Sequence, residues 1–233
     1  MPAVWRKKNE LPRMFTRQEE ETMQKMEITN RIAQTGVMAV VRITSLERGI
    51  QIAEGCLAGG VDVMEISYTS DHATEYIRQL SERFGNMLVG AGTVLDSETA
   101  RIAIDAGARF IVAPNFSKDV ALLCNRYQIP YCPGCSSYTE MVEALSYGAA
   151  FVKCFPISNF YGPEMVKVLK TPLPYMPVLV SGGIRLDNID QWLDNGADVL
   201  AVGTLLTKGS SEEIAANGCE ILRHIRASRE RRA

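Results

Sequence analysis

The sequence lacks the features that mark membrane, secreted and nucleic-acid-binding proteins. No apolar run approaches the roughly 18 residues that a membrane-spanning helix needs, and the N-terminus, Met1 to Lys8, has no apolar core of a signal peptide. The formal net charge is only -2 and the Lys and Arg residues are scattered, so no basic stripe suggests nucleic-acid or anionic-membrane binding. We therefore expect a cytoplasmic protein with a small-molecule ligand, without nucleic-acid or membrane partners.

Cysteine and histidine are too few and too dispersed to indicate a disulfide framework or a metal site. Six cysteines are spread over 233 residues, which is typical of reduced thiols. Cys132 and Cys135 form a C-x-x-C pattern, but zinc would need a second ligand pair and thioredoxin-like chemistry would need the pattern to open a helix. We interpret this pair as small residues at a strand end and the following turn. His72 and His224 have no second histidine at metal-ligand spacing, so we expect surface or capping roles and no metal.

The composition that is present fits one α/β domain. Hydrophobic residues make up 46% of the chain and charged residues 22%, which suits a single sizeable core. Residues 1–15 are polar and unpatterned, and we expect a flexible tail there, with one domain over 16–233. From Thr16 to about Gln34, apolar residues interspersed among charges predict a helix that covers one end of the fold.

Short β-rich runs then alternate with helical segments. Three pairs at capping-box spacing mark helix starts, and glycine recurs at four helix-to-strand joints, where it suits a left-handed turn. Eight such units favour a closed (β/α)8 TIM barrel of the α/β class. An open doubly wound sheet is the alternative, but residues 41–44 do not supply the G-x-G-x-x-G turn it would need. The predicted strands are 37–43, 61–67, 88–92, 109–113, 129–132, 150–155, 177–181 and 199–203, and the capping pairs are Thr44 with Glu47, Ser137 with Glu140 and Ser210 with Glu213.

Two ionisable residues stand alone in apolar strands. Lys153 lies in the run Phe151–Pro156, and Glu65 lies in Val63–Ile66. A buried ammonium must be paired, reach the rim or deprotonate, and desolvation lowers a lysine pKa. The neutral amine can attack a carbonyl and form a Schiff base. A snorkelling lysine or a structural ion pair is the alternative, but we favour chemistry, with Glu65 as the base that moves protons.

The C-terminal strand ends carry a chemically coherent set of residues, and barrels of this type hold their active sites there. Glycine turns follow the seventh and eighth strands, where backbone N–H groups commonly bind phosphate, so we predict a phosphorylated substrate. Arg42 is suited to clamp a carboxylate or phosphate, or else to form a surface salt bridge. The set consists of Arg42, Glu65, Thr93, Pro114, Asn115, Pro133, Gly134, Lys153, Ser181, Gly182, Gly183, Gly203 and Thr204.

These residues and their neighbours resemble the class I 2-keto-3-deoxy-6-phosphogluconate (KDPG) aldolase and 4-hydroxy-2-oxoglutarate aldolase family. The resemblance implies a homotrimeric barrel without metal or cofactor. It also implies reversible cleavage of a 2-keto-3-deoxy sugar acid phosphate to pyruvate and glyceraldehyde 3-phosphate, or of 4-hydroxy-2-oxoglutarate to pyruvate and glyoxylate. The resemblance extends over about residues 36–227 and rests on Val63–Ser67, Val89–Leu95, Val112–Pro114, Pro133–Gly134, Val152–Pro156, Ser181–Ile184 and Val202–Thr204.

The resemblance also implies a role for each matching residue. Some members have arginine at the position of Thr69, and many have threonine at the position of Ser181. Arg42 is similar to the arginine that other members use, and it would supply the missing positive charge. The implied roles are a Schiff base on Lys153, general acid/base catalysis by Glu65, carboxylate binding by Thr93 and Ser181, pocket packing by Pro114 and Phe155, and phosphate binding by Gly182, Gly183, Gly203 and Thr204.

Two other functional classes stay open on the residues alone. A phosphosugar isomerase or epimerase barrel would share the phosphate-binding glycines but would use acid/base pairs without an imine, and Lys153 argues against it. A non-catalytic phosphosugar-binding protein would keep the fold, because a fold by itself does not fix a function. Intact phosphate binding without turnover would support that second alternative.

Overall fold

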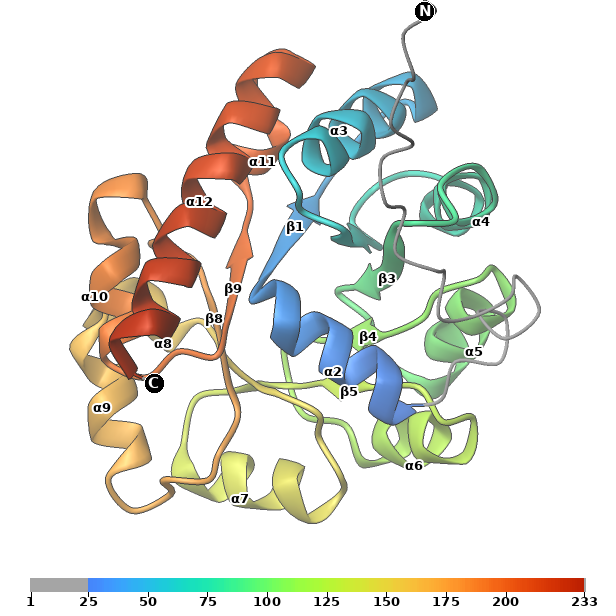
Figure 1. Cartoon of the computed structure of the whole chain (residues 1–233). Coiled ribbons are helices and arrows are strands. Elements are labelled where there is room, and N and C mark those ends of the chain that lie inside the picture. The colour runs from blue at the N-terminus through green and yellow to red at the C-terminus, as the bar shows by residue number, and fades with distance from the viewer. Residues whose placement is uncertain (1–24, 233) are drawn as a thin grey trace, which may run out of the picture.

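The strands form one parallel sheet that closes into a barrel (Figure 1). The computed structural model describes residues 25–232, so the predicted tail and residues 16–24 of the predicted first helix lie outside the described residues. All strand pairs are parallel, which confirms the predicted α/β barrel. The order is β5 (Tyr131–Cys132), β4 (Ile111–Val112), β3 (Leu88–Gly92), β2 (Val63–Ser67), β1 (Val37–Val41), β9 (Val199–Val202), β8 (Val178–Ser181), β7 (Val152–Cys154) and β6 (Gly134–Cys135).

The barrel closes through one strand that Pro133 divides into two short ladders. The N-terminal half, β5, pairs with β4, and the C-terminal half, β6, pairs with β7. Proline has no N–H to give to a ladder, but the Pro133 carbonyl accepts the N–H of Lys153 at 2.8 Å. The interpretation of Cys132–Cys135 as a strand end and turn is therefore wrong, because Gly134 and Cys135 continue the strand. Both thiols are buried, Cys132 in an inner cluster and Cys135 in an outer one.

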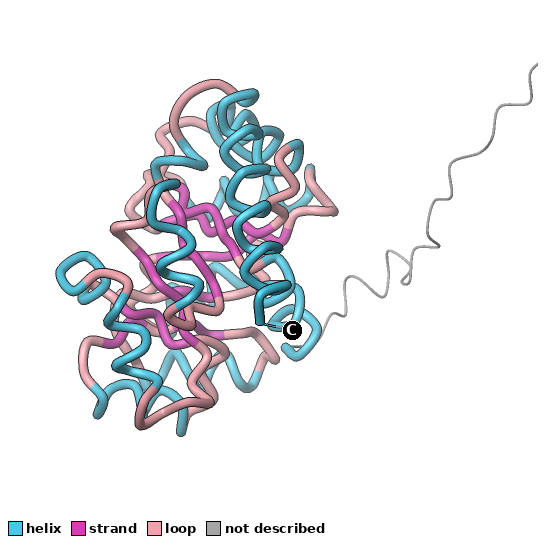
Figure 2. The backbone as a smooth tube through the Cα atoms, turned by 60° about the vertical axis from the view of Figure 1, so that its left-hand side comes forward, coloured by secondary structure: helices cyan, strands magenta, loops and turns pink. Residues whose placement is uncertain are grey.

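Helices surround the strands on the outside of the barrel (Figures 1 and 2). The capping pairs of Ser137 with Glu140 and of Ser210 with Glu213 are confirmed by reciprocal hydrogen bonds. The pair that begins at Thr44 is wrong by one residue, because Ser45 caps that helix and accepts the Arg48 N–H. The helices are α2 (Lys25–Thr35), α3 (Leu46–Ala58), α4 (Ala73–Arg83), α5 (Ser97–Asp105), α6 (Lys118–Arg126), α7 (Tyr138–Ser146), α8 (Ile157–Tyr161), α9 (Glu164–Lys170), α10 (Ile189–Asp194), α11 (Thr204–Thr207) and α12 (Ser211–Arg232), with a 3-10 turn at Leu186–Asn188.

Helix α2 covers the N-terminal end of the barrel. Its apolar face places Ile28 and Ile32 in the inner cluster, together with Met38 and Val199 from the first halves of their strands and Phe151 just before β7. This confirms the predicted covering helix for its described part. Because the N-terminal end is filled by apolar side chains, a ligand can reach the interior only from the C-terminal end.

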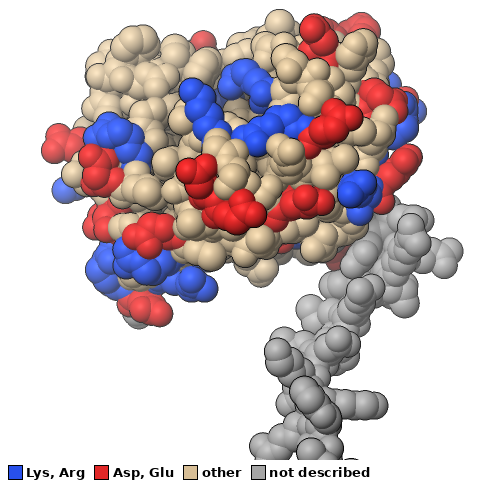
Figure 3. All heavy atoms as spheres, turned by 90° about the horizontal axis from the view of Figure 1, so that it is seen from above, with Lys and Arg blue, Asp and Glu red and all other residues tan. Residues whose placement is uncertain are grey.

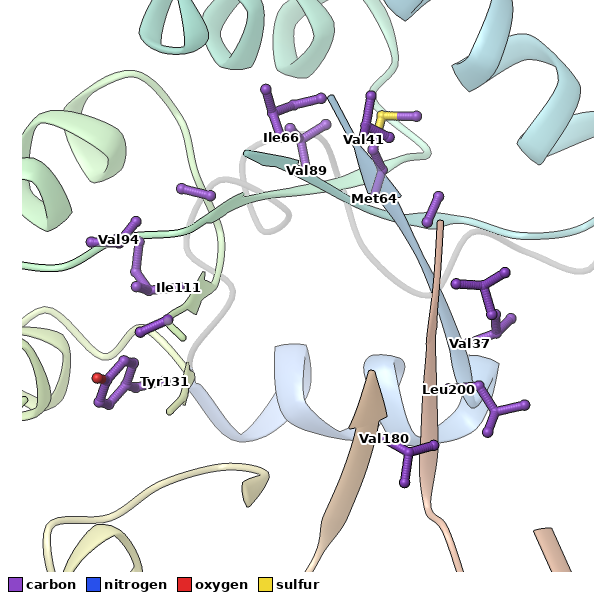
Figure 4. Close-up of a cluster of buried hydrophobic side chains, with 14 of the residues drawn as sticks. Val37, Val41, Met64, Ile66, Val89, Val94, Ile111, Tyr131, Val180 and Leu200 are labelled. Carbon is purple, nitrogen blue, oxygen red and sulfur yellow. The ribbon is translucent and has the colours of Figure 1, made fainter. Parts of the chain in front are cut away.

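Alternate residues of each strand face the helices or the lumen, as the pleat of a strand requires. Figure 4 shows Val41, Met64 and Ile66 pointing outward from the strands, and these residues belong to the outer core. Val63 belongs to the inner cluster. Glu65 and Ser67, two and four residues further along β2, therefore share the inward direction of Val63.

The remaining expectations concern the surface. On the face that Figure 3 shows, basic side chains gather near a hollow and acidic side chains lie beside them. His72 is exposed at the start of α4, and the half-buried His224 lies within hydrogen-bond distance of Asp190, so neither histidine lies near the barrel lumen. Within residues 25–232, no helix is both long and apolar enough to span a bilayer.

Candidate active site

Glu65 and Lys153 project into the lumen from opposite walls of the barrel. Glu65 is on β2 and Lys153 is on β7. When β5 and β6 are counted as one strand, three strands lie between β2 and β7 in either direction around the barrel. The two side chains are only 1% and 7% exposed, respectively. The structure thus brings the two residues predicted from the sequence into one buried space, where the Lys153 charge acts on the Glu65 carboxyl.

The Glu65 carboxyl has few polar neighbours. Its Oε2 atom is buried without a hydrogen-bond partner. Burial raises the pKa of Glu65 above its ordinary value, and the positive charges of Lys153 and Arg42 oppose this effect more weakly. A carboxyl in such a setting exchanges a proton more readily near neutral pH than an exposed glutamate does.

The residues that flank Lys153 are apolar. In the sheet it stands between Gly134 of β6 and Leu179 of β8. Its Nζ atom lies 5.0 Å from the ring centroid of Phe155, which is the next inward-facing residue of the same chain segment. Phe155 therefore packs beside the amine, and the pocket-packing role that the resemblance implies for it stays a prediction. The lysine side chain thus ends inside the lumen, where its amine, once neutral, can attack a carbonyl compound.

Two glycines allow close contacts inside the barrel, one with the Glu65 carboxyl and one with the backbone of Pro114. A Cβ atom on Gly92 would lie 2.6 Å from Oε1 of Glu65, and one on Gly134 would overlap the carbonyl of Pro114. Gly92 is thus required for the carboxyl position. Pro114 approaches the fifth strand closely because Gly134 has no side chain.

The two predicted phosphate-binding turns lie side by side. Strands β8 and β9 are neighbours, with Ser181 opposite Ala201, so the turns that follow them meet at the same rim. Gly182 and Gly183 have φ values of +96° and +71°, which L-residues rarely adopt. Gly203 precedes α11, and Thr204 is the exposed first residue of that helix.

A hydroxyl cluster on β2 and β3 includes one residue that the sequence reasoning missed. Ser67 Oγ lies 2.8 Å from Thr93 Oγ1 and 2.8 Å from Thr69 Oγ1. Thr93 has a left-handed φ of +60°. Ser67 could have been found from the alternation in β2, since it follows Glu65 by two residues on the same face.

Helix α8 contributes Asn159, a second residue that the sequence reasoning missed. Ser158 Oγ donates to the Ser181 carbonyl, which ties α8 to the end of β8. The Asn159 carboxamide then lies against Gly182, so closely that a side chain on that glycine would overlap it. No pattern in the sequence signals Asn159, because this short helix was not predicted.

Arg42 lies at the rim of the barrel, near the hydroxyl cluster. Arg42 follows β1, is exposed, and acts on Glu65 through its charge. Strand β1 pairs with β2, so Arg42 lies at the same end of the barrel as Ser67 and Thr69. Within residues 25–232, no group of three or more His, Cys, Asp or Glu side chains is arranged to hold a metal ion.

Known proteins share this sequence pattern and this fold. The chain is 34% identical over 167 residues to the 2-dehydro-3-deoxy-phosphogluconate aldolase of Treponema pallidum (strain Nichols), with 72% of this chain and 79% of the relative covered. It is 33% identical over 180 residues to the 2-dehydro-3-deoxy-6-phosphogalactonate aldolase of Escherichia coli (strain K12), with 76% and 87% covered. A crystal structure of KDPG aldolase from Legionella pneumophila, with pyruvate captured as a covalent carbinolamine intermediate, matches with a TM-score of 0.73 and 26% identity over 88% of this chain and 98% of that one. These relatives identify the protein as an aldolase, a carbon–carbon lyase.

The family can be stated more narrowly. The family described as "KDPG and KHG aldolase" matches residues 28–220, which is most of the chain. The chain belongs to this aldolase family. The resemblance drawn from the sequence motifs is confirmed, and so is the barrel that it implied.

Proposed function

We propose that this protein is a Schiff-base aldolase that reversibly cleaves a 2-keto-3-deoxy sugar acid phosphate to pyruvate and glyceraldehyde 3-phosphate. The observation that carries the proposal is the pair of lone ionisable side chains, Glu65 and Lys153, which face each other inside the closed barrel. Membership of the KDPG and KHG aldolase family supports the reaction class. The use of 4-hydroxy-2-oxoglutarate as a further substrate follows from the same family description.

The chemistry begins at Lys153. Its neutral amine attacks the C2 carbonyl of the keto acid, and the carbinolamine loses water to give an imine. A base then removes the proton of the C4 hydroxyl, the C3–C4 bond breaks, and its electron pair moves into the protonated imine to give the enamine of pyruvate. The aldehyde leaves, the enamine takes a proton at C3, and water hydrolyses the imine to release pyruvate and the amine.

Glu65 is the group we assign to these proton transfers. It is the carboxyl that shares the lumen with Lys153, and its raised pKa matches a residue that both accepts and donates protons. The proton that Glu65 takes from the carbinolamine or the C4 hydroxyl is later returned to the enamine, so the residue ends the cycle in its starting form.

The two anionic ends of the substrate are assigned to two sets of residues at the C-terminal rim of the barrel. Thr93 and Ser181 hold the pyruvyl carboxylate, and Arg42 supplies the positive charge that Thr69 does not. The glycine turns at 182–183 and 203–204 hold the phosphate through backbone N–H groups. Pro114 and Phe155 pack against the carbon chain between them.

We also propose how the enzyme is assembled and where it works. A homotrimer is supported by the family resemblance and by an apolar surface in which Phe160 of α8 is 77% exposed. A cytoplasmic location is supported by six free cysteines, five of them buried. The reaction uses no metal or cofactor, since the lysine imine serves as the electron sink. Residues 16–233 form the single catalytic domain, preceded by the polar tail at 1–15.

Product analysis tests the proposal. The protein is treated with a chelator and incubated with 2-keto-3-deoxy-6-phosphogluconate, with 4-hydroxy-2-oxoglutarate, and with the unphosphorylated sugar acid, and pyruvate is measured with lactate dehydrogenase. We expect pyruvate from the first two substrates and a much lower kcat/KM for the third. Isomerised sugar without pyruvate would instead identify an isomerase, and phosphate-dependent binding without any product would identify a binding protein.

A further inference from the structure

The hydroxyl groups of Ser67, Thr69 and Thr93 form a short hydrogen-bonded chain at the C-terminal ends of β2 and β3. Ser67 is the central member, with both threonine Oγ1 atoms 2.8 Å from its Oγ. Its side chain is 0% exposed, whereas Thr69 is exposed and Thr93 is half-buried. Ser67 thus connects a surface hydroxyl to the hydroxyl that the proposed function places against the substrate carboxylate.

The Ser67 hydroxyl has few possible hydrogen-bonding arrangements. A serine hydroxyl has one proton and two lone pairs, and one lone pair of Ser67 accepts the backbone N–H of Thr69 at 3.3 Å. One proton and one lone pair remain for the two threonine hydroxyls. Ser67 must therefore donate to one threonine and accept from the other.

Only one of the two resulting orders suits an anionic ligand. If Ser67 donates to Thr69, then Thr93 donates to Ser67 and turns only lone pairs toward the pocket, where they repel a carboxylate. If Ser67 donates to Thr93, the Thr93 proton is free for the ligand. A carboxylate accepts hydrogen bonds and donates none, so it selects the second order.

We propose that Ser67 is a positioning residue that donates its proton to Thr93 and thereby makes Thr93 a donor to the substrate carboxylate. The inference rests on the proposed function, because that function places the carboxylate at Thr93. The backbone supports it independently. Thr93 has a φ of +60°, a region that residues with a side chain rarely occupy, so the fold holds this residue in an unusual conformation in which its hydroxyl lies 2.8 Å from that of Ser67.

A matched pair of variants tests the hydroxyl without changing its shape. Valine and threonine have nearly the same volume, so Ser67→Val and Ser67→Thr add the same bulk to the buried site, and only Ser67→Thr keeps the hydroxyl. The readouts are kcat, KM, and the pyruvate concentration that gives half-maximal borohydride-trapped adduct on Lys153. For Ser67→Val we expect this concentration and KM to rise about tenfold relative to Ser67→Thr, as for the loss of one hydrogen bond, with kcat changed less than about threefold.

A second variant, at the exposed residue Thr69, tests the direction of the hydrogen bonds among the three hydroxyl groups. Thr69→Val removes the competing acceptor for the Ser67 proton. If the two proton orders are equally populated in the free enzyme, the competent fraction rises from half to all, and the half-maximal pyruvate concentration falls by up to about twofold. A rise in this concentration would mean that Thr69 itself holds the carboxylate and would overturn the proposed order.

The outcomes separate the inference from the function on which it rests. Equal pyruvate affinity in Ser67→Val and Ser67→Thr, with an adduct formed on Lys153 in both, would overturn the role of Ser67 and leave the aldolase mechanism intact. If the unsubstituted protein forms no adduct at saturating pyruvate, the Schiff-base mechanism and the role of Ser67 both fail.

Discussion

The position of the Glu65 carboxyl depends on the missing side chain of Gly92. A Cβ atom at residue 92 would lie 2.6 Å from Oε1 and 2.8 Å from Cδ of Glu65, whereas ordinary contacts begin at 3.4 Å. In Gly92→Ala, the carboxyl therefore has to retreat by about 0.8 Å, and a displacement near 1 Å can lower a rate about a hundredfold. We expect kcat to fall by roughly tenfold to a hundredfold.

The same substitution should leave the fold nearly unchanged. The φ of Gly92 lies outside the left-handed region, so alanine is compatible with the backbone. Replacing glycine by alanine at a compatible position also reduces the entropy of the unfolded chain, an effect of about 0.4–1 kcal/mol. We therefore expect the free energy of unfolding to stay within about 1 kcal/mol of the unsubstituted protein.

Two control variants separate activity from stability. In Gly90→Ala, on the same strand, the new Cβ would lie 2.5 Å from the Phe110 ring, so we expect a loss of roughly 1–3 kcal/mol in unfolding free energy from overpacking. In Gly85→Ala the new Cβ has no neighbour within 4 Å, so kcat should not change and the unfolding free energy should rise by no more than about 1 kcal/mol. The assays are pyruvate release from the sugar acid phosphate and urea unfolding. An unaltered kcat in a folded Gly92→Ala protein would refute the requirement for this carboxyl position.

Three further predictions concern the charged residues of the site. Lys153→Ala should abolish nearly all cleavage while the circular dichroism spectrum stays unchanged, and normal turnover would remove the lysine from the mechanism. Glu65→Gln should lower kcat about a hundredfold to ten-thousandfold. The pKa of Glu65 is higher in the folded protein than its ordinary value of 4.5. This carboxyl therefore favours folding at a pH below 4.5, and it loses that effect as the pH rises through the raised pKa. The unfolding free energy of Glu65→Gln relative to the unsubstituted protein should therefore increase between acid and neutral pH, and a decrease in urea titrations would contradict the burial effect. Arg42→Ala should move the acid limb of the pH profile of kcat/KM to higher pH, since the Arg42 charge lowers the pKa of Glu65; an unshifted limb would show that Arg42 does not act on Glu65.

The barrel could be predicted because each unit repeats the same local signals. Apolar strands alternate with capped helices, and glycines such as Gly107 and Gly196 take positive φ values at the joints, as expected. The division of the fifth strand at Pro133 was missed, because the hydrogen bonds that extend it through Cys135 come from β7, a strand distant in the sequence. Short-range patterns do not contain that information.

Only part of the candidate site could be predicted, because some of its residues are recognisable from local sequence and others only from contacts between distant segments. Glu65 and Lys153 are visible in the sequence because each interrupts an apolar strand. Ser67 is not visible as a positioning residue, since its importance arises from the approach of Thr93 on the neighbouring strand. Asn159 meets Gly182 only after α8 folds back onto β8.

The most direct test of the account is the intact mass of the protein after incubation with pyruvate and borohydride, followed by peptide mapping. The account predicts a single reduced pyruvate adduct on the peptide that contains Lys153, and no adduct in Lys153→Ala. A folded protein that forms no adduct, or forms one on a different lysine, would contradict the Schiff-base mechanism proposed for this barrel.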